Sequence, residues 1–283
     1  MRYRLRQLGV WVLAIAFTVG SGSMAVAGPF IFSGTDSDDH GSASGGANQD
    51  GWLFMQKALE NLAPAITNSN KVVTILGSTG DAADAANSAF NLSSLAGAGW
   101  TVQTVSTANF ATFFGAGGGL ANAGILMMDS GDNVFGGVDG SAFVPYATAI
   151  NTFLGNGGGL FSQGNGYDWV STLVPGLTVT DVGGGGVFTS LSLTASGSAA
   201  FPGLTNGDLS TGPWHNYFTG TGAIPILATA PFGGVDRALI IGARSGSITD
   251  PGGPGAGVPE PASLLLLGAG LFGLASFSRR MKA

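Results

Sequence analysis

The chain has 283 residues, of which 50 are glycine and none is cysteine, and it carries 10 Lys+Arg against 16 Asp+Glu. The missing cysteine excludes a disulfide scaffold, a thiol enzyme and a cysteine-ligated metal centre. The acidic balance excludes a basic protein that binds nucleic acid.

The N-terminal segment predicts a secretory signal peptide over residues 1–27. Three arginines precede an apolar run at residues 8–19, and the small residues Ala25-Val26-Ala27 follow. A basic start, a short apolar stretch and an Ala-x-Ala motif are typical of such signals. We expect signal peptidase to cleave after Ala27, so that the exported chain begins at Gly28. The alternative is that the segment stays attached as a membrane anchor.

Residues 28–249 predict a single α/β domain, because short apolar runs alternate with segments of helical period. The expected strands lie at residues 29–32, 71–76, 100–105, 124–128 and 159–163. The expected helices lie at residues 52–62, 84–95, 108–114 and 146–154. Strands that are apolar throughout and separated by helices favour a doubly wound, mostly parallel, flavodoxin-like sheet. Later strands within residues 177–242 predict a small β-rich C-terminal extension, and the many glycines leave an all-β sandwich as the alternative.

Two segments of this domain resemble the class I glutamine amidotransferase-like fold, including its trehalose-utilisation-type relatives. They are the strand that ends in Asp129 (GILMMD) and residues 153–161 (FLGNGGGLF), which follow a predicted helix. In that family a cysteine nucleophile follows the fifth strand, and the matching position here is Gly164. The family's His-x-Glu corresponds best to His215, which has no carboxylate two residues later. The resemblance therefore implies the fold without the amidotransferase activity.

A serine hydrolase is the alternative enzyme hypothesis. Ser162 would be the nucleophile, His215 the base, and Asp129 or Asp168 the group that orients the base. No Gly-x-Ser-x-Gly motif surrounds Ser162. A structural role of His215 in its aromatic loop is the competing interpretation, and we expect no catalytic residues and no cofactor other than calcium.

Acidic loops are candidates for calcium binding. Asp36 and Asp38 follow the first predicted strand, and Asp129 and Asp132 follow the fourth. Loops at the carboxyl ends of parallel strands converge on one edge of a sheet, and calcium prefers oxygen ligands. We therefore treat these four carboxylates as candidate calcium ligands, with a simply solvated surface as the alternative.

Aromatic residues suggest a carbohydrate-binding surface. Tyr167 lies close to Trp169, and Trp214 lies close to Tyr217 and Phe218. If exposed, these rings would stack on sugars, and an exopolysaccharide becomes a candidate partner. The alternative is that the tryptophans belong to the core.

The C-terminus carries a sorting tail. A Gly/Pro linker at residues 250–258 leads into Pro259-Glu260-Pro261, a nearly apolar stretch at residues 262–277, and the basic pair Arg279-Arg280. A helix of this length spans about 24 Å, short of a hydrocarbon core of about 30 Å, so it predicts a short transmembrane helix with only transient insertion in the inner membrane. The order of the three elements resembles the PEP-CTERM sorting signal, whose tail an exosortase recognises and cleaves. An ordinary tail anchor is the alternative.

These features together predict an exported protein of a Gram-negative bacterium, located at the cell surface or in the extracellular matrix. Residues 28–258 hold four basic and fifteen acidic side chains, a net charge of −11. Such a surface suits solubility outside the cell and disfavours nucleic acid. The predicted role is non-catalytic, either structural or ligand-binding, and the expected partners are signal peptidase and exosortase.

Overall fold

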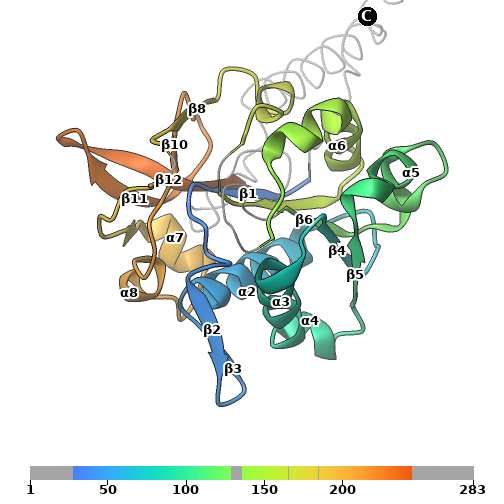
Figure 1. Cartoon of the computed structure of the whole chain (residues 1–283), viewed down its shortest axis with the longest axis horizontal. Helices are drawn as coiled ribbons and strands as arrows, with labels where there is room; N and C mark the ends of the chain where they lie inside the picture. Colours follow the sequence, from blue (N-terminus) through green and yellow to red (C-terminus); the bar gives the residue numbers. More distant parts are fainter. Residues whose placement is uncertain (1–27, 129–135, 165, 184, 244–283) are drawn as a thin grey trace, which may run out of the picture.

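The computed structural model describes residues 28–128, 136–164, 166–183 and 185–243. Within these residues ten strands form one mixed sheet, in the order β5-β4-β6-β7-β1-β12-β10-β8, with β11 paired to β12 and to β9 (Figure 1). The parallel strands are β1 (Phe30–Ser33), β4 (Val72–Leu76), β5 (Thr101–Val105), β6 (Ile125–Met128) and β7 (Gly159–Ser162).

The remaining strands of the sheet pair antiparallel with their neighbours. They are β8 (Thr178–Asp181), β9 (Ser192–Leu193), β10 (Asn216–Thr219), β11 (Ile226–Phe232) and β12 (Val235–Ala243). A separate hairpin consists of β2 (Gly41–Ser44) and β3 (Ala47–Gln49). The predicted α/β class with a mostly parallel central sheet is confirmed, and the all-β alternative is wrong.

Helices cover both faces of the sheet (Figure 1). One face carries α2 (Asp50–Leu62), α3 (Gly80–Asn91), α4 (Ser94–Gly97), α7 (Ala195–Ala200) and α8 (Asn206–Leu209). The other face carries α5 (Phe110–Phe114) and α6 (Ala147–Gly155). Short 3₁₀ turns are η1 (Ala63–Ala65), η2 (Thr107–Asn109), η3 (Gly119–Asn122), η4 (Gly140–Tyr146) and η5 (Val170–Thr172).

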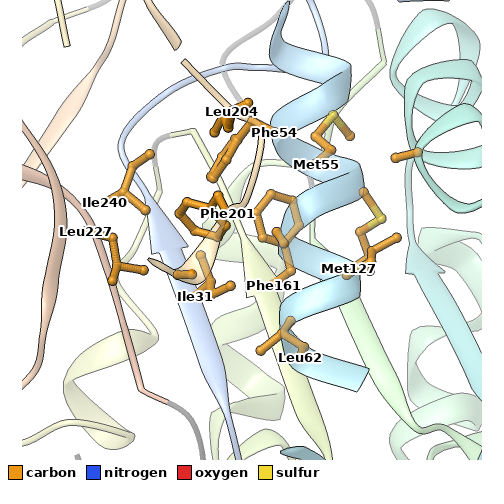
Figure 2. Close-up of a cluster of buried hydrophobic side chains, with 14 of the residues drawn as sticks. Ile31, Phe54, Met55, Leu62, Met127, Phe161, Phe201, Leu204, Leu227 and Ile240 are labelled. Atoms are coloured by element: carbon orange, nitrogen blue, oxygen red, sulfur yellow. The ribbon is translucent and has the colours of Figure 1, made fainter. Parts of the chain in front are cut away.

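The central parallel strands β1, β4, β6 and β7 are almost entirely buried because each lies between two hydrophobic cores, whereas the edge strand β5 is largely exposed. In β1, Ile31 packs on the α2 side, whereas Phe30 and Phe32 pack on the α5 and α6 side. This is the alternation of successive side chains that any strand imposes. Figure 2 shows the core on the α2 side of the sheet, where the ring of Phe54 in α2 packs against the ring of Phe161. The centroids of these two rings are 5.7 Å apart. The ring of Phe54 also meets that of Phe201 at 5.4 Å.

The place of β1 in the strand order could not be predicted from local sequence patterns. In a flavodoxin-like sheet the first strand lies between the second and third. Here β1 instead pairs parallel with β7 and antiparallel with β12, next to the antiparallel strands. The segment after β1 therefore lies beside the segment after β7.

No helix within the described ranges is long and apolar enough to cross a membrane. The predicted transmembrane stretch at residues 262–277 lies outside these ranges, as do the signal peptide with Ala27, the tail residues Pro259 to Arg280, and the candidate calcium ligands Asp129 and Asp132.

Candidate functional site: the polar cluster beyond β1 and β7

A chain of buried hydroxyl groups leads out of β1. The side-chain oxygen of Ser33 lies 2.7 Å from that of Thr35, which lies 2.7 Å from that of Ser37. All three residues are buried. Because buried hydroxyl groups are costly without partners, these mutual hydrogen bonds allow a polar run to fold inside the protein.

The carboxylate of Asp36 contacts two histidine side chains. Its Oδ2 atom lies 3.1 Å from Nε2 of His215 and 3.5 Å from Nε2 of His40. The hydrogen bond with Asp36 raises the pKa of His40 above its ordinary value, partial burial opposes this, and the negative charges of Asp36 and Asp39 add to it. The His215 backbone N–H donates to the carbonyl of Gly34 at 2.7 Å, which fixes the imidazole beside the carboxylate.

The end of β7 is connected to the end of β1 by further hydrogen bonds. The Tyr167 hydroxyl lies 2.7 Å from the Ser33 carbonyl and 2.9 Å from the Ser162 carbonyl, and it accepts from the Ser33 N–H at 3.2 Å. Burial raises the pKa of Tyr167 far above its usual range. Nε2 of Gln163 donates to Oδ1 of Asp38 at 3.1 Å. Direct hydrogen bonds therefore join the two loops.

Gly164, the position that matches the amidotransferase nucleophile, has a backbone role. Its φ of +85° lies in the left-handed region that favours glycine. Its N–H donates to the Thr35 carbonyl at 2.7 Å, and its carbonyl accepts from the side-chain amide of Asn216. The residue thus closes the turn between the two loops.

Of the hydrolase candidates, Ser162, His215 and Asp168 lie within the described residues, and Asp129 lies outside them. Ser162 and His215 are each 4% exposed, and no hydrogen bond joins Oγ of Ser162 to His215. The imidazole faces Asp36, which the sequence suggested as a metal ligand. The cavity beside Asp36 and His40 measures about 10 Å³, which is roughly the space of one water molecule and too small for a substrate.

The two described calcium candidates have protein partners. Asp36 contacts the histidines, and Asp38 accepts from Gln163. Across the part of the chain that the structure describes, no group of three or more His, Asp or Glu side chains is arranged to hold a metal ion.

A larger cleft of about 440 Å³ lies at the same edge of the sheet, and sequence reasoning did not anticipate its composition. Three carboxylates line it, those of Asp139, Asp168 and Asp181. Two of these carboxylates accept hydrogen bonds from the backbone two residues later in the chain. Asp139 accepts from the Ser141 N–H and Asp181 from the Gly183 N–H, both at 2.7 Å. The detectable signal was the position of Asp139 in the loop after the fourth predicted strand.

The hypothesis of a carbohydrate-binding aromatic surface is wrong, and the alternative that the tryptophans belong to the core is confirmed. Trp169 is 2% exposed and Trp214 is fully buried, and both pack in the hydrophobic cores with Tyr167 and Phe218. Tyr217 is half-buried beneath the guanidinium of Arg237, whose Cζ lies 4.8 Å from the ring centroid. None of these rings offers an open face of the kind that a sugar would need.

Comparison with known proteins identifies the tail. Residues 257–280 match the PEP-CTERM protein-sorting motif, which includes Pro259, Glu260, Pro261, Arg279 and Arg280. No curated protein and no solved structure matches the chain. The motif implies a protein that is exported through the membrane to the cell surface of a Gram-negative bacterium and is recognised by an exosortase.

Proposed function

We propose that this chain is a non-catalytic, structural or ligand-binding protein of the cell envelope or extracellular matrix. The observation that carries the proposal is the match of residues 257–280 to the PEP-CTERM motif. In this proposal the domain at residues 28–249 is the cargo, and the tail at residues 259–283, attached through the linker at residues 250–258, is its sorting signal.

The polar cluster supports a non-catalytic role. Asp36, Asp38 and His215 are buried and bonded to partners within the protein, and the cavity beside them is about the size of a water molecule. Enzyme sites instead occupy concave pockets that admit substrate. The cluster therefore has the character of an internal lock between the loops after β1 and β7.

A distant relation to the amidotransferase-like fold is part of the proposal. The parallel strands run β5-β4-β6-β7-β1. If β4 is counted as the first strand and β1 as the last, this is the flavodoxin-like order 2-1-3-4-5. Gly164 at the position of the nucleophile is consistent with a domain that retains the strand order of that fold but not its catalytic cysteine.

The proposed route has two cleavages. Signal peptidase removes residues 1–27, and the apolar stretch at residues 262–277 then halts in the inner membrane with Arg279 and Arg280 on the cytoplasmic side. The exosortase cuts near Pro259-Glu260-Pro261 and releases the domain towards the cell surface.

The test is the intact mass of the protein from fractionated host cells. A variant with Pro259, Glu260 and Pro261 all changed to Ala is compared with wild type. The matched control changes two prolines and one acid in the linker, namely Asp250→Ala, Pro251→Ala and Pro254→Ala, outside the matched motif.

We expect wild type and the linker control to lose both ends and to leave the inner membrane, and the motif variant to keep its tail there. A wild-type protein that retains its tail would contradict sorted release. The non-catalytic part is tested separately with p-nitrophenyl esters, and hydrolysis that Ser162→Ala abolishes would contradict it in favour of the serine hydrolase.

A further inference from the structure

A groove of about 770 Å³ lies at the edge of the sheet opposite the polar cluster. Asn68 and Asn70 line it just before β4, and Asn156 lines it just before β7. Thr148 and Thr152 of α6 form another wall. The volume falls within the range of about 300–1,000 Å³ that is typical of small-ligand pockets. We call this cavity the amino-edge groove.

Charge is missing from the amino-edge groove. None of the described residues that line it is Asp, Glu, Lys, Arg or His, although residues 28–258 hold fifteen acidic side chains. Because a charged ligand needs an opposite charge or a metal when it leaves water, the lining disfavours phosphates, carboxylates and metal ions. The groove suits a neutral ligand.

A rigid pair of aromatic rings forms part of the groove. The rings of Phe114 and Tyr146 stack with centroids 4.6 Å apart and planes 15° apart, and Phe110 meets Tyr146 edge-on at 6.0 Å. Tyr146 is half-buried, and its hydroxyl makes no hydrogen bond to the described residues. The groove thus has an apolar ring with a polar tip, which suits a ligand with both kinds of surface.

Amide and hydroxyl groups around the rings are held in place by the backbone. The side-chain amide of Asn68 donates to the Ala123 carbonyl, and that of Asn70 to the Ala121 carbonyl, both at 2.9 Å. The Asn156 side chain is exposed and makes no hydrogen bond within the described residues. The groove therefore offers fixed oxygen acceptors together with at least one amide that can both donate and accept.

We infer that the amino-edge groove binds a neutral oligosaccharide. Sugar hydroxyls donate and accept hydrogen bonds, which matches the asparagine and threonine groups. The C–H faces of a sugar ring are apolar, which matches the half-buried Tyr146 ring and the neighbouring Leu120 and Pro145 in the groove wall. The inference goes beyond the proposed function, because it does not depend on how the protein is sorted and it concerns residues that the sequence analysis did not single out.

The test is isothermal titration calorimetry on the full chain, purified in a detergent that carries no sugar. The probes are short neutral oligosaccharides of glucose, galactose and mannose, with an oligogalacturonate as the acidic probe. The blocking variant is Thr148→Trp, and the matched control is Asn151→Trp, which is exposed on the same helix and does not line the groove. Thermal unfolding of both variants verifies that they fold.

We expect at least one neutral probe to bind, with affinity that changes less than about twofold between about 0.05 and 0.5 M NaCl because no ion pair contributes. Thr148→Trp should weaken binding at least about tenfold, or about 1.4 kcal/mol, and Asn151→Trp should leave it unchanged. The inference is overturned if no neutral probe binds at about 10 mM. It is also overturned if both variants bind equally well, or if the oligogalacturonate binds as tightly as the neutral probes.

Discussion

Changing Tyr167 to Phe tests whether the loops after β1 and β7 are locked together as the hydrogen bonds indicate. The substitution keeps the ring in its core and removes one hydroxyl, which contacts the carbonyls of Ser33 and Ser162 and accepts from the Ser33 N–H. That N–H then loses its acceptor in a buried place. A buried unsatisfied group costs about 1–3 kcal/mol. For a domain of this size, a loss near 2 kcal/mol lowers Tm by about 4–8 °C.

Tyr146→Phe is the matched control, because it removes a tyrosine hydroxyl that makes no hydrogen bond to the described residues. Its effect should stay within about 0.5 kcal/mol, or about 1–2 °C. The assay is thermal unfolding of the two variants and wild type, followed by circular dichroism in one buffer. Equal shifts for the two variants would refute the reasoning, because they would show that the buried hydroxyl contributes nothing specific.

Three further predictions concern backbone spacing, pH and calcium. A Cβ on Gly34 would lie 1.8 Å from the Asn216 backbone oxygen, so Gly34→Ala should lower Tm by at least several degrees in the same thermal assay. A Cβ on Gly155 would meet nothing within 4 Å, so Gly155→Ala should stabilise α6 by about 0.5–1 kcal/mol. The pKa of His40 is raised above 6.5 in the fold, so its stabilisation is fully present below the unfolded pKa and disappears as the pH rises through the folded pKa. Wild-type Tm should therefore fall more steeply between about pH 5.5 and pH 8 than that of His40→Gln, and parallel curves would contradict this. The carboxylate of Asp36 already contacts two histidines, so calcium should raise the Tm of wild type no more than that of Asp36→Asn. A calcium-dependent Tm increase that is lost in Asp36→Asn would support the calcium hypothesis.

The fold class could be predicted because burial on two faces leaves a local signature. The Phe-Ile-Phe run of β1 is apolar at every position since each ring or branch enters one of the two cores. The strand order could not be predicted, because the pairing of Phe30 with Ala243 joins segments that local periodicity treats as unrelated. The same long-range pairing decides which loops meet.

The candidate site shows the same limit more sharply. Asp36 and His215 were both singled out, but for different roles, and the contact that joins them spans 179 positions. For Trp214 the sequence left a surface position and a core position open, and the structure places its ring in the core, where the indole N–H donates to Thr189 Oγ1 at 3.0 Å. The amino-edge groove was missed because asparagine and threonine in loops and on a helix surface form no pattern of charge or hydropathy.

The two edges of the parallel sheet have different characters, and this bears on where the protein meets its surroundings. Open α/β sheets usually bind ligands at the carboxyl ends of their strands. Here the polar side chains directly after β1 are bonded to one another and to the loop after β7, and the open space at this edge is the cleft lined by Asp139, Asp168 and Asp181. The amino edge carries the neutral groove, and β12 also ends there, since Ala243 pairs with Phe30 at the start of β1. The last described strand therefore ends at the edge that holds the groove, and the opposite edge holds the polar cluster.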